Sequence, residues 1–160
     1  MVYSRLFARL AVAAGVVLVA GCTVAPAKKN DSPPDTACKP AASNDPLIGN
    51  WLSVRKQSGV SGELHTLFTL NADGTMVYSE RLKRGRGPSQ GIAETGCWER
   101  QAGALQLRTL TSNGLPVDLN DPIYVNRYHV VSGGGSSLQL GYQGITLKAK
   151  KMPLDYRLPL

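Results

Sequence analysis

Residues 63–82, ELHTLFTLNADGTMVYSERL, decide the fold of this chain. In the first eight residues Leu64, Phe68 and Leu70 lie on one face at a period of two, with Leu67 as the exception, which is typical of a half-buried β-strand. Residues Asn71–Gly74 then provide the residue types of a tight hairpin turn, and residues 75–82 form a second strand-like segment. The stretch therefore predicts two antiparallel strands joined by a turn.

The same kind of pattern continues on both sides of this hairpin. Residues 50–56 alternate polar and apolar side chains, and further short strands are predicted at 92–100, 104–112, 122–131, 137–142 and 144–150. Glycine-containing breaks separate these segments, and no helix longer than a turn is expected. About eight short strands in consecutive hairpins predict an all-β fold, either a small antiparallel up-and-down barrel or a compact β-sandwich. We favour the barrel, because closure leaves no exposed sheet edge.

A short motif stands at the head of the strand series. Gly49-Asn50-Trp51 begins the first predicted strand, and Gly96-Cys97-Trp98 repeats its spacing midway along the chain. With the hairpins that follow, it resembles the G-x-W motif of bacterial lipocalin-like lipoproteins. The resemblance implies that Trp51 is a core residue across the closed end of a barrel. In place of the family's arginine, which covers the tryptophan from the last strand, this chain has Lys148 and Lys150, with Arg157 beyond them.

The N-terminal residues have the composition of a secretory signal peptide. Residues 1–9 contain Arg5 and Arg9 and no acidic residue, and residues 10–20 form an uncharged apolar run. A basic head followed by such a run is typical of export signals. The run is too short to span a membrane, which takes about 20 apolar residues.

Val19-Ala20-Gly21-Cys22 follows the apolar run and resembles the lipobox of bacterial lipoproteins. The resemblance implies that residues 1–21 are removed and that Cys22 becomes an acylated N-terminus. Two or more acyl chains, such as palmitate, anchor a protein stably, whereas one does not. Residue 23 is threonine and not aspartate, which by the same resemblance favours export to the outer membrane, facing the periplasm. We therefore expect a lipid-anchored protein of the cell envelope.

A proline-rich stretch lies between the lipobox and the first strand. Residues 22–45 contain four prolines, and Val24 is their one sizeable aliphatic residue. Such a composition cannot bury enough apolar surface to offset the loss of chain entropy, so a flexible linker is predicted. The chain then divides into a signal peptide (1–21), a lipidated cysteine with its linker (22–45) and a β-barrel domain (46–160).

The two cysteines outside the lipobox bear on whether the protein is exported to an oxidising compartment. With Cys22 assigned to lipid, Cys38 and Cys97 remain as an even pair, and disulfides form in exported proteins. A disulfide between them would close a loop of about 60 residues and stabilise the fold by a few kcal/mol. The alternatives are a buried Cys97 with a free Cys38, or a bridge from Cys38 to another chain.

The chain of 160 residues is basic, with 18 Lys and Arg against 11 Asp and Glu. A candidate anion-binding loop holds four of these cations next to Gly85, Gly87 and Pro88, namely Arg81, Lys83, Arg84 and Arg86. The alternative is a solvated loop that keeps the protein soluble. We expect the membrane as a partner through the lipid anchor, together with an anionic envelope component or an envelope protein. Nucleic acid is not expected, because no aromatic stacking motif accompanies the basic residues.

No catalytic or metal-binding motif is recognisable. His65 and His129 each lie alone in a predicted strand, and a five-residue spacing puts Glu94 and Glu99 on opposite faces of one strand. Residues 118–122 start like a calcium loop but lack its glycine and distal glutamate, so a turn is expected. We therefore predict a protein that is not an enzyme, with no cofactor and no metal.

Two functions fit these features. The first is a non-catalytic binding domain for a small ligand or an envelope partner. The second is a structural accessory, or an inhibitor or immunity-type lipoprotein, that acts through its protein surface. A barrel of about eight strands is either filled by side chains or holds one small ligand. An interior packed by Phe68, Tyr78, Tyr124 and Tyr128 favours surface recognition, whereas a lined cavity favours ligand binding.

Overall fold

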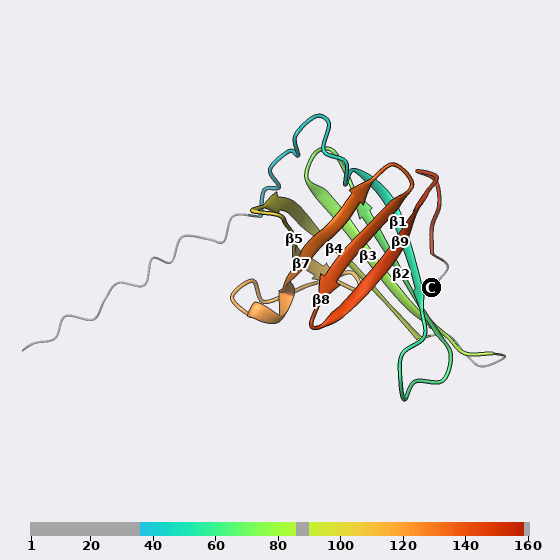
Figure 1. Ribbon diagram of the computed structural model, residues 1–160. Helices are drawn as coiled ribbons and strands as arrows, with labels where there is room; N and C mark the ends of the chain where they lie inside the picture. Colours follow the sequence, from blue (N-terminus) through green and yellow to red (C-terminus); the bar gives the residue numbers. More distant parts are fainter. Residues whose placement is uncertain (1–35, 86–89, 159–160) are drawn as a thin grey trace, which may run out of the picture. The chain divides into compact units, whose positions relative to one another are not determined.

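The computed structural model describes residues 36–85 and 90–158 (Figure 1). This part of the chain is almost entirely β-structure, with one short 3-10 helix, η1. The elements in chain order are β1 (Gly49–Arg55), β2 (Glu63–Leu70), β3 (Thr75–Lys83), β4 (Gln90–Gln101), β5 (Ala104–Ser112), β6 (Leu115–Pro116), η1 (Pro122–Tyr124), β7 (Val125–Gly134), β8 (Ser137–Tyr142) and β9 (Ile145–Met152). Within the described ranges no helix is long and apolar enough to cross a membrane.

Eight of these strands form a closed antiparallel barrel. The sheet runs in the order β4-β3-β2-β1-β9-β8-β7-β5, and β4 also pairs with β5, which closes the ring. The two-residue strand β6 pairs with the C-terminal end of β5. Neighbouring barrel strands follow one another along the chain, and β1 and β9 join its two ends. The predicted up-and-down barrel is therefore confirmed, and the sandwich alternative is wrong because the sheet closes on itself.

The hairpin of residues 63–82 has the predicted register. Phe68 lies opposite Tyr78, and the turn between β2 and β3 is closed by a hydrogen bond from Asn71 N to Thr75 O at 2.9 Å. Gly74 has a φ of +83°, and a Cβ there would collide with the backbone carbonyl of Lys39. Glycine is thus required both by the turn and by the segment that packs against it.

The segment before β7 differs from the prediction. Residues 122–131 were expected to form one strand, but the first three form η1 and the strand begins at Val125. The Asp121 carboxylate caps this helix by accepting a hydrogen bond from Ile123 N at 3.0 Å, and Pro122 fits its first turn. The expected turn is present just before it, where Asp121 N donates to Asp118 O at 3.1 Å.

The interior of the barrel is a packed apolar core. Its members face inward from all eight barrel strands, and Leu47 joins them from the segment before β1. The buried cluster comprises Leu47, Trp51, Phe68, Leu70, Met76, Trp98, Leu105, Leu107, Tyr128, Leu138, Leu140, Leu147 and Ala149. Trp51 is completely buried, as expected of a core residue.

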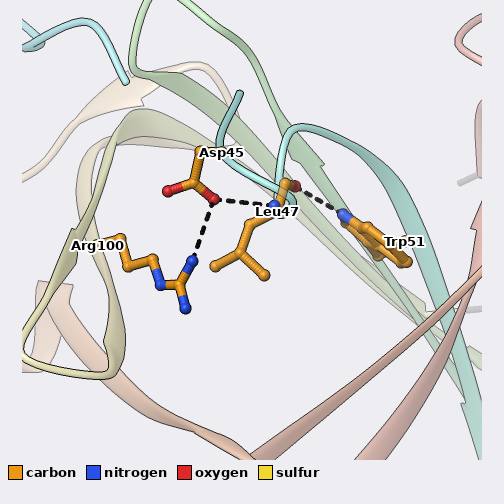
Figure 2. Close-up of polar contacts among 4 residues, drawn as sticks. All are labelled: Asp45, Leu47, Trp51 and Arg100. Carbon is orange, nitrogen blue, oxygen red and sulfur yellow. Dashed lines mark hydrogen bonds and ion pairs between the residues drawn. The ribbon is translucent and has the colours of Figure 1, made fainter. Parts of the chain in front are cut away.

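The segment before β1 closes one end of the barrel (Figure 2). Trp51 Nε1 donates a hydrogen bond to Leu47 O at 2.7 Å, and Leu47 N donates to Asp45 Oδ1 at 2.9 Å. The same carboxylate oxygen lies 3.8 Å from Arg100 Nη1 on β4. We call this the closed end, and the opposite end, at which β1, β3, β5 and β8 finish, the open end.

Residues 36–45 lie against the barrel, although their composition is that of a linker. Ala41 N donates to Ala72 O at 3.0 Å, and Cys38 is bonded to Cys97 on β4. A covalent bond and backbone hydrogen bonds hold this segment, so that few apolar side chains are needed. The earlier part of the expected linker lies outside the described residues.

Candidate functional site

Two of the expected features lie wholly or partly outside the described residues. The signal peptide and Cys22 are among residues 1–35, and Arg86 is among residues 86–89. The lipid anchor at Cys22 therefore stays a prediction from the sequence.

The predicted disulfide between Cys38 and Cys97 is present, with a Sγ–Sγ distance of 2.02 Å. It joins the segment before the barrel to the middle of β4. Cys97 is 7% exposed, so the bond is largely sheltered from solvent. The alternatives of two free thiols and of a bridge to another chain do not apply to this structure.

Three of the four cations of the candidate anion-binding loop, Arg81, Lys83 and Arg84, lie among the described residues. Arg81 and Lys83 face outward from the end of β3, opposite His65 and Glu63 of β2. Lys83 and Arg84 are exposed, whereas Arg81 is half-buried. Glu63 places a carboxylate on the same outer surface, 3.5 Å from His65 Nε2. Anion binding by this loop therefore remains a prediction.

The cation that covers Trp51 is Lys151. Its Nζ lies 5.2 Å from the centre of the indole ring, because β1 and β9 pair Trp51 with Lys151. Lys148 and Lys150 lie on the outer face of the same strand. Arg157 donates a hydrogen bond to the carbonyl oxygen of Leu154 at 2.8 Å. Sequence reasoning missed Lys151, because the register of β9 against β1 decides which lysine faces inward.

Aromatic side chains fill the middle of the barrel. Phe68 makes edge-to-face contacts with Tyr78 and Tyr128 at 5.4 and 5.5 Å, and Tyr142 stacks on Tyr128 at 4.8 Å. Three of the four expected aromatic residues thus pack inside, whereas Tyr124 lies in η1. The closed half of the barrel is a filled core, which favours recognition at the open end or on the outer surface.

Polar side chains face inward above this aromatic layer, toward the open end. The Thr66 hydroxyl and the Tyr78 hydroxyl both donate to Glu80 Oε2, at 3.0 and 2.7 Å. On the next strands, Thr109 Oγ1 donates to Glu94 Oε2 at 3.1 Å. We call the inward polar set the polar mouth; it consists of Ser53, Arg55, Thr66, Glu80, Glu94, Thr109, Asn126 and Tyr142.

Several groups of the polar mouth have unused hydrogen-bonding capacity. Ser53 Oγ and Arg55 Nε are buried and have no hydrogen-bond partner within the described ranges. The guanidinium of Arg55 donates through Nη1 to Gln57 at 3.1 Å. Neither Glu80 nor Glu94 forms an ion pair with any residue that the structure describes.

Burial keeps Tyr78 and Tyr128, the two tyrosines next to the polar mouth, protonated. Burial, and then the nearby Glu80 carboxylate, raise the pKa of the Tyr78 hydroxyl far above its ordinary value of 10.0. Burial, followed by Tyr142, raises the pKa of Tyr128 in the same direction. Both hydroxyls are therefore neutral near pH 7 and able to donate a hydrogen bond, as the Tyr78 hydroxyl does to Glu80.

Sequence reasoning did not find the polar mouth. It placed Glu94 and Glu99 on opposite faces of one strand, which is correct, since Glu99 accepts a hydrogen bond from Gln106 on the outer face. The carboxylate that accompanies Glu94 is Glu80 on the neighbouring strand. The available signal in the sequence was the presence of polar residues at inward-facing positions of three strands. Only the register of these strands shows that the residues lie together.

The polar mouth holds no evident metal centre. Among the residues that the structure describes, no three His, Cys, Asp or Glu side chains are grouped as metal ligands would be. Its chemistry is that of hydrogen bonding and charge recognition.

No protein-family model and no curated protein matches this chain. Two solved structures are similar to it in fold. A lipocalin-like protein from Bacteroides uniformis is 17% identical, with a TM-score of 0.43, and the match covers 68% of this chain and 100% of that one. The lipoprotein YedD from Klebsiella pneumoniae is 16% identical, also with a TM-score of 0.43, and the match covers 76% and 84% of the two chains.

Proposed function

We propose that this protein is a lipoprotein of the cell envelope, anchored through acylated Cys22, whose barrel binds a small ligand at the polar mouth without catalysing a reaction. The observation that carries the proposal is the unused bonding capacity of inward groups at the open end. Ser53 is 1% exposed, and its hydroxyl has no partner in the described part of the chain. A buried polar group without a hydrogen bond costs about 1–3 kcal/mol, so a ligand that bonds to it gains that energy.

The packing of the barrel limits the size and depth of the ligand. Phe68, Tyr78 and Tyr128 fill the interior below the mouth. Leu64, Leu82 and Ile92 face the same space from β2, β3 and β4 and remain half-buried. A ligand would therefore sit shallowly, with its polar groups on the mouth and its apolar body against these three side chains.

The expected anchor and the disulfide support an envelope location. The lipobox resemblance predicts attachment to a membrane, with the outer membrane favoured and the domain facing the periplasm. A disulfide between Cys38 and Cys97 is typical of an oxidising compartment outside the cytoplasm.

Co-purification tests ligand binding. The protein is extracted from envelopes in detergent and analysed by native mass spectrometry, which detects small molecules retained by the barrel. We expect a retained compound in the wild type and its loss in the Asn126→Leu variant, which fills the mouth. The matched control is Gln139→Leu on the outer side of β8. No retained compound, or equal retention by both variants, would argue against a ligand in the mouth.

A protein partner is the second candidate function, and exposed apolar side chains beside the open end favour it. Leu115 and Ile123 are 71% and 69% exposed, and Val125 is 41% exposed. An accessory or inhibitor protein would use such a surface. Loss of a specific envelope protein from pull-downs with Leu115→Ser and Ile123→Ser, while the retained small molecule stays, would favour this second function.

The basic segment that begins at the end of β3 is a further proposed contact, with anionic envelope material. Replacing Arg81, Lys83, Arg84 and Arg86 by Ser should abolish salt-sensitive binding to anionic vesicles. Unchanged vesicle binding by this variant would show that these four cations do not bind anionic envelope material.

A further inference from the structure

The two glutamates of the polar mouth come from neighbouring strands. Glu80 on β3 lies opposite Ile92 of β4, and Glu94 lies two residues further along β4, opposite Tyr78. Diagonal positions of this kind on one face of an antiparallel pair are about 7–8 Å apart. Two carboxylates of like charge therefore share one inward-facing region of the barrel.

Within the described ranges, the hydrogen bonds that these carboxylates accept come from neutral hydroxyl groups. Thr66 and Tyr78 donate to Oε2 of Glu80, and Thr109 donates to Oε2 of Glu94. The Oε1 atoms of both glutamates have no hydrogen-bond partner among the residues described. Charge-assisted bonds to a cation are about twice as strong as neutral ones, and these two acceptors can provide them.

Arg55 faces the same space but does not neutralise the pair. Its side chain donates to Gln57 at the rim, and it forms no ion pair with Glu80 or Glu94. The polar mouth therefore holds two carboxylates and one guanidinium. Ser53 provides an independent indication of a ligand, because its buried hydroxyl lies opposite Thr66, which bonds to Glu80, and has no partner of its own in the described ranges.

The walls of the mouth suit an apolar or aromatic body. Tyr128 and Tyr142 present stacked rings from β7 and β8, and Leu64, Leu82 and Ile92 face inward from β2, β3 and β4. Aromatic rings attract ammonium groups through their negative faces. We infer that the polar mouth binds a small organic cation, an amine attached to an aromatic or apolar body, with Glu80 and Glu94 as its counter-charges. The inference rests on the proposed function and adds the chemical class of the ligand.

Three probes with the same phenylethyl body and different charge test this inference: 2-phenylethylamine, 2-phenylethanol and 3-phenylpropanoate. Each is titrated by calorimetry into the full-length protein purified in detergent. We expect the amine to bind at least tenfold more tightly than the alcohol, and the carboxylate to show no binding. Added salt should weaken binding of the amine and leave binding of the alcohol nearly unchanged.

Charge-neutral variants identify the groups responsible. Glu80→Gln and Glu94→Gln should each weaken binding of the amine at least tenfold, and the control Glu99→Gln, on the outer face of the same strand as Glu94, should leave it unchanged. Circular dichroism melting shows whether each variant is folded; where Glu80→Gln fails to fold, Glu94→Gln alone decides.

The outcomes separate the inference from the proposed function. Equal binding of amine and alcohol, or of wild type and both glutamine variants, would overturn cation selection and leave a ligand site of another class. Binding of none of the three probes would also overturn the inference. The proposed function would then depend on the co-purification result alone.

Discussion

Two hydroxyl groups inside the barrel are equally buried, but among the described residues one of them forms a hydrogen bond and the other does not. Ser53 and Thr109 are each 1% exposed; Thr109 donates to Glu94, whereas Ser53 Oγ has no partner within the described ranges. Removing a bonded hydroxyl by Thr109→Val should lower the free energy of unfolding by about 1–3 kcal/mol. Removing the unbonded hydroxyl by Ser53→Ala should leave the free energy of unfolding unchanged or raise it by about 1 kcal/mol.

Urea unfolding of the two variants measures this difference. Each substitution removes a hydroxyl from the interior, so a difference between them reports hydrogen bonding. A loss of stability in Ser53→Ala as large as that in Thr109→Val would mean that the Ser53 hydroxyl is bonded in solution.

The buried tyrosines predict a loss of stability at alkaline pH. Burial raises the pKa of both Tyr78 and Tyr128 above the ordinary value of 10.0. Near that pH the unfolded chain loses these protons while the native state keeps them, so the free energy of unfolding falls as pH rises further. Stability should therefore be fully present below about pH 9 and decline above about pH 10.

Denaturant unfolding across this range provides the test, with Tyr128→Phe as the comparison. That variant should show a shallower decline than the wild type, because one late-titrating group is gone. A parallel decline in both proteins would assign the alkaline effect to other groups, such as the lysines.

At the scale of elements, the segment before β1 is a clamp at the closed end. Cys38 bonds to Cys97, and Leu47 enters the core, where it is completely buried. In the chain-entropy model, a bond that closes a loop with a sequence separation of 59 stabilises a protein by about 4 kcal/mol. The double variant Cys38→Ser/Cys97→Ser should accordingly lower the free energy of unfolding by about 2–5 kcal/mol, as measured with denaturant.

A reducing agent provides the matched control. It should lower the stability of the wild type by a similar amount and leave the double variant unchanged. If reduction had no effect on the wild type, the bond would be absent from the protein in solution.

The strands could be predicted from the sequence because their signal is local. The alternation in β2 and β3 and the glycine at the turn between them lie within 20 residues, and both strands formed as expected. The polar mouth could not be found, because Glu80 and Glu94 share a site only after β3 and β4 have paired in one register. For the same reason Lys151 was not recognised as the cation over Trp51, since β9 meets β1 only when the barrel closes.

At the scale of the whole molecule, the predicted anchor and the folded domain are separate in sequence. The barrel, its closed end and the disulfide use residues from 36 onward. The described core is made from side chains at Leu47 and beyond, none of them in the predicted signal peptide or at Cys22. We therefore expect membrane residence to depend on the acyl chains, because stable anchoring takes two or more of them.

This separation leads to opposite expectations for two changes at the N-terminus. Cys22→Ser should block lipidation and the cleavage that follows it, and leave an uncleaved precursor held in the inner membrane by residues 10–20. Replacing residues 1–22 by an ordinary cleavable signal should release a folded periplasmic domain, because the Cys38–Cys97 bond and the described strands of the barrel are formed by later residues. Fractionation of both variants, with thermal melting of the released domain, measures these outcomes. If the released form still sedimented with outer membranes at high salt, where charge contacts are screened, the outer surface of the barrel would itself bind an envelope component.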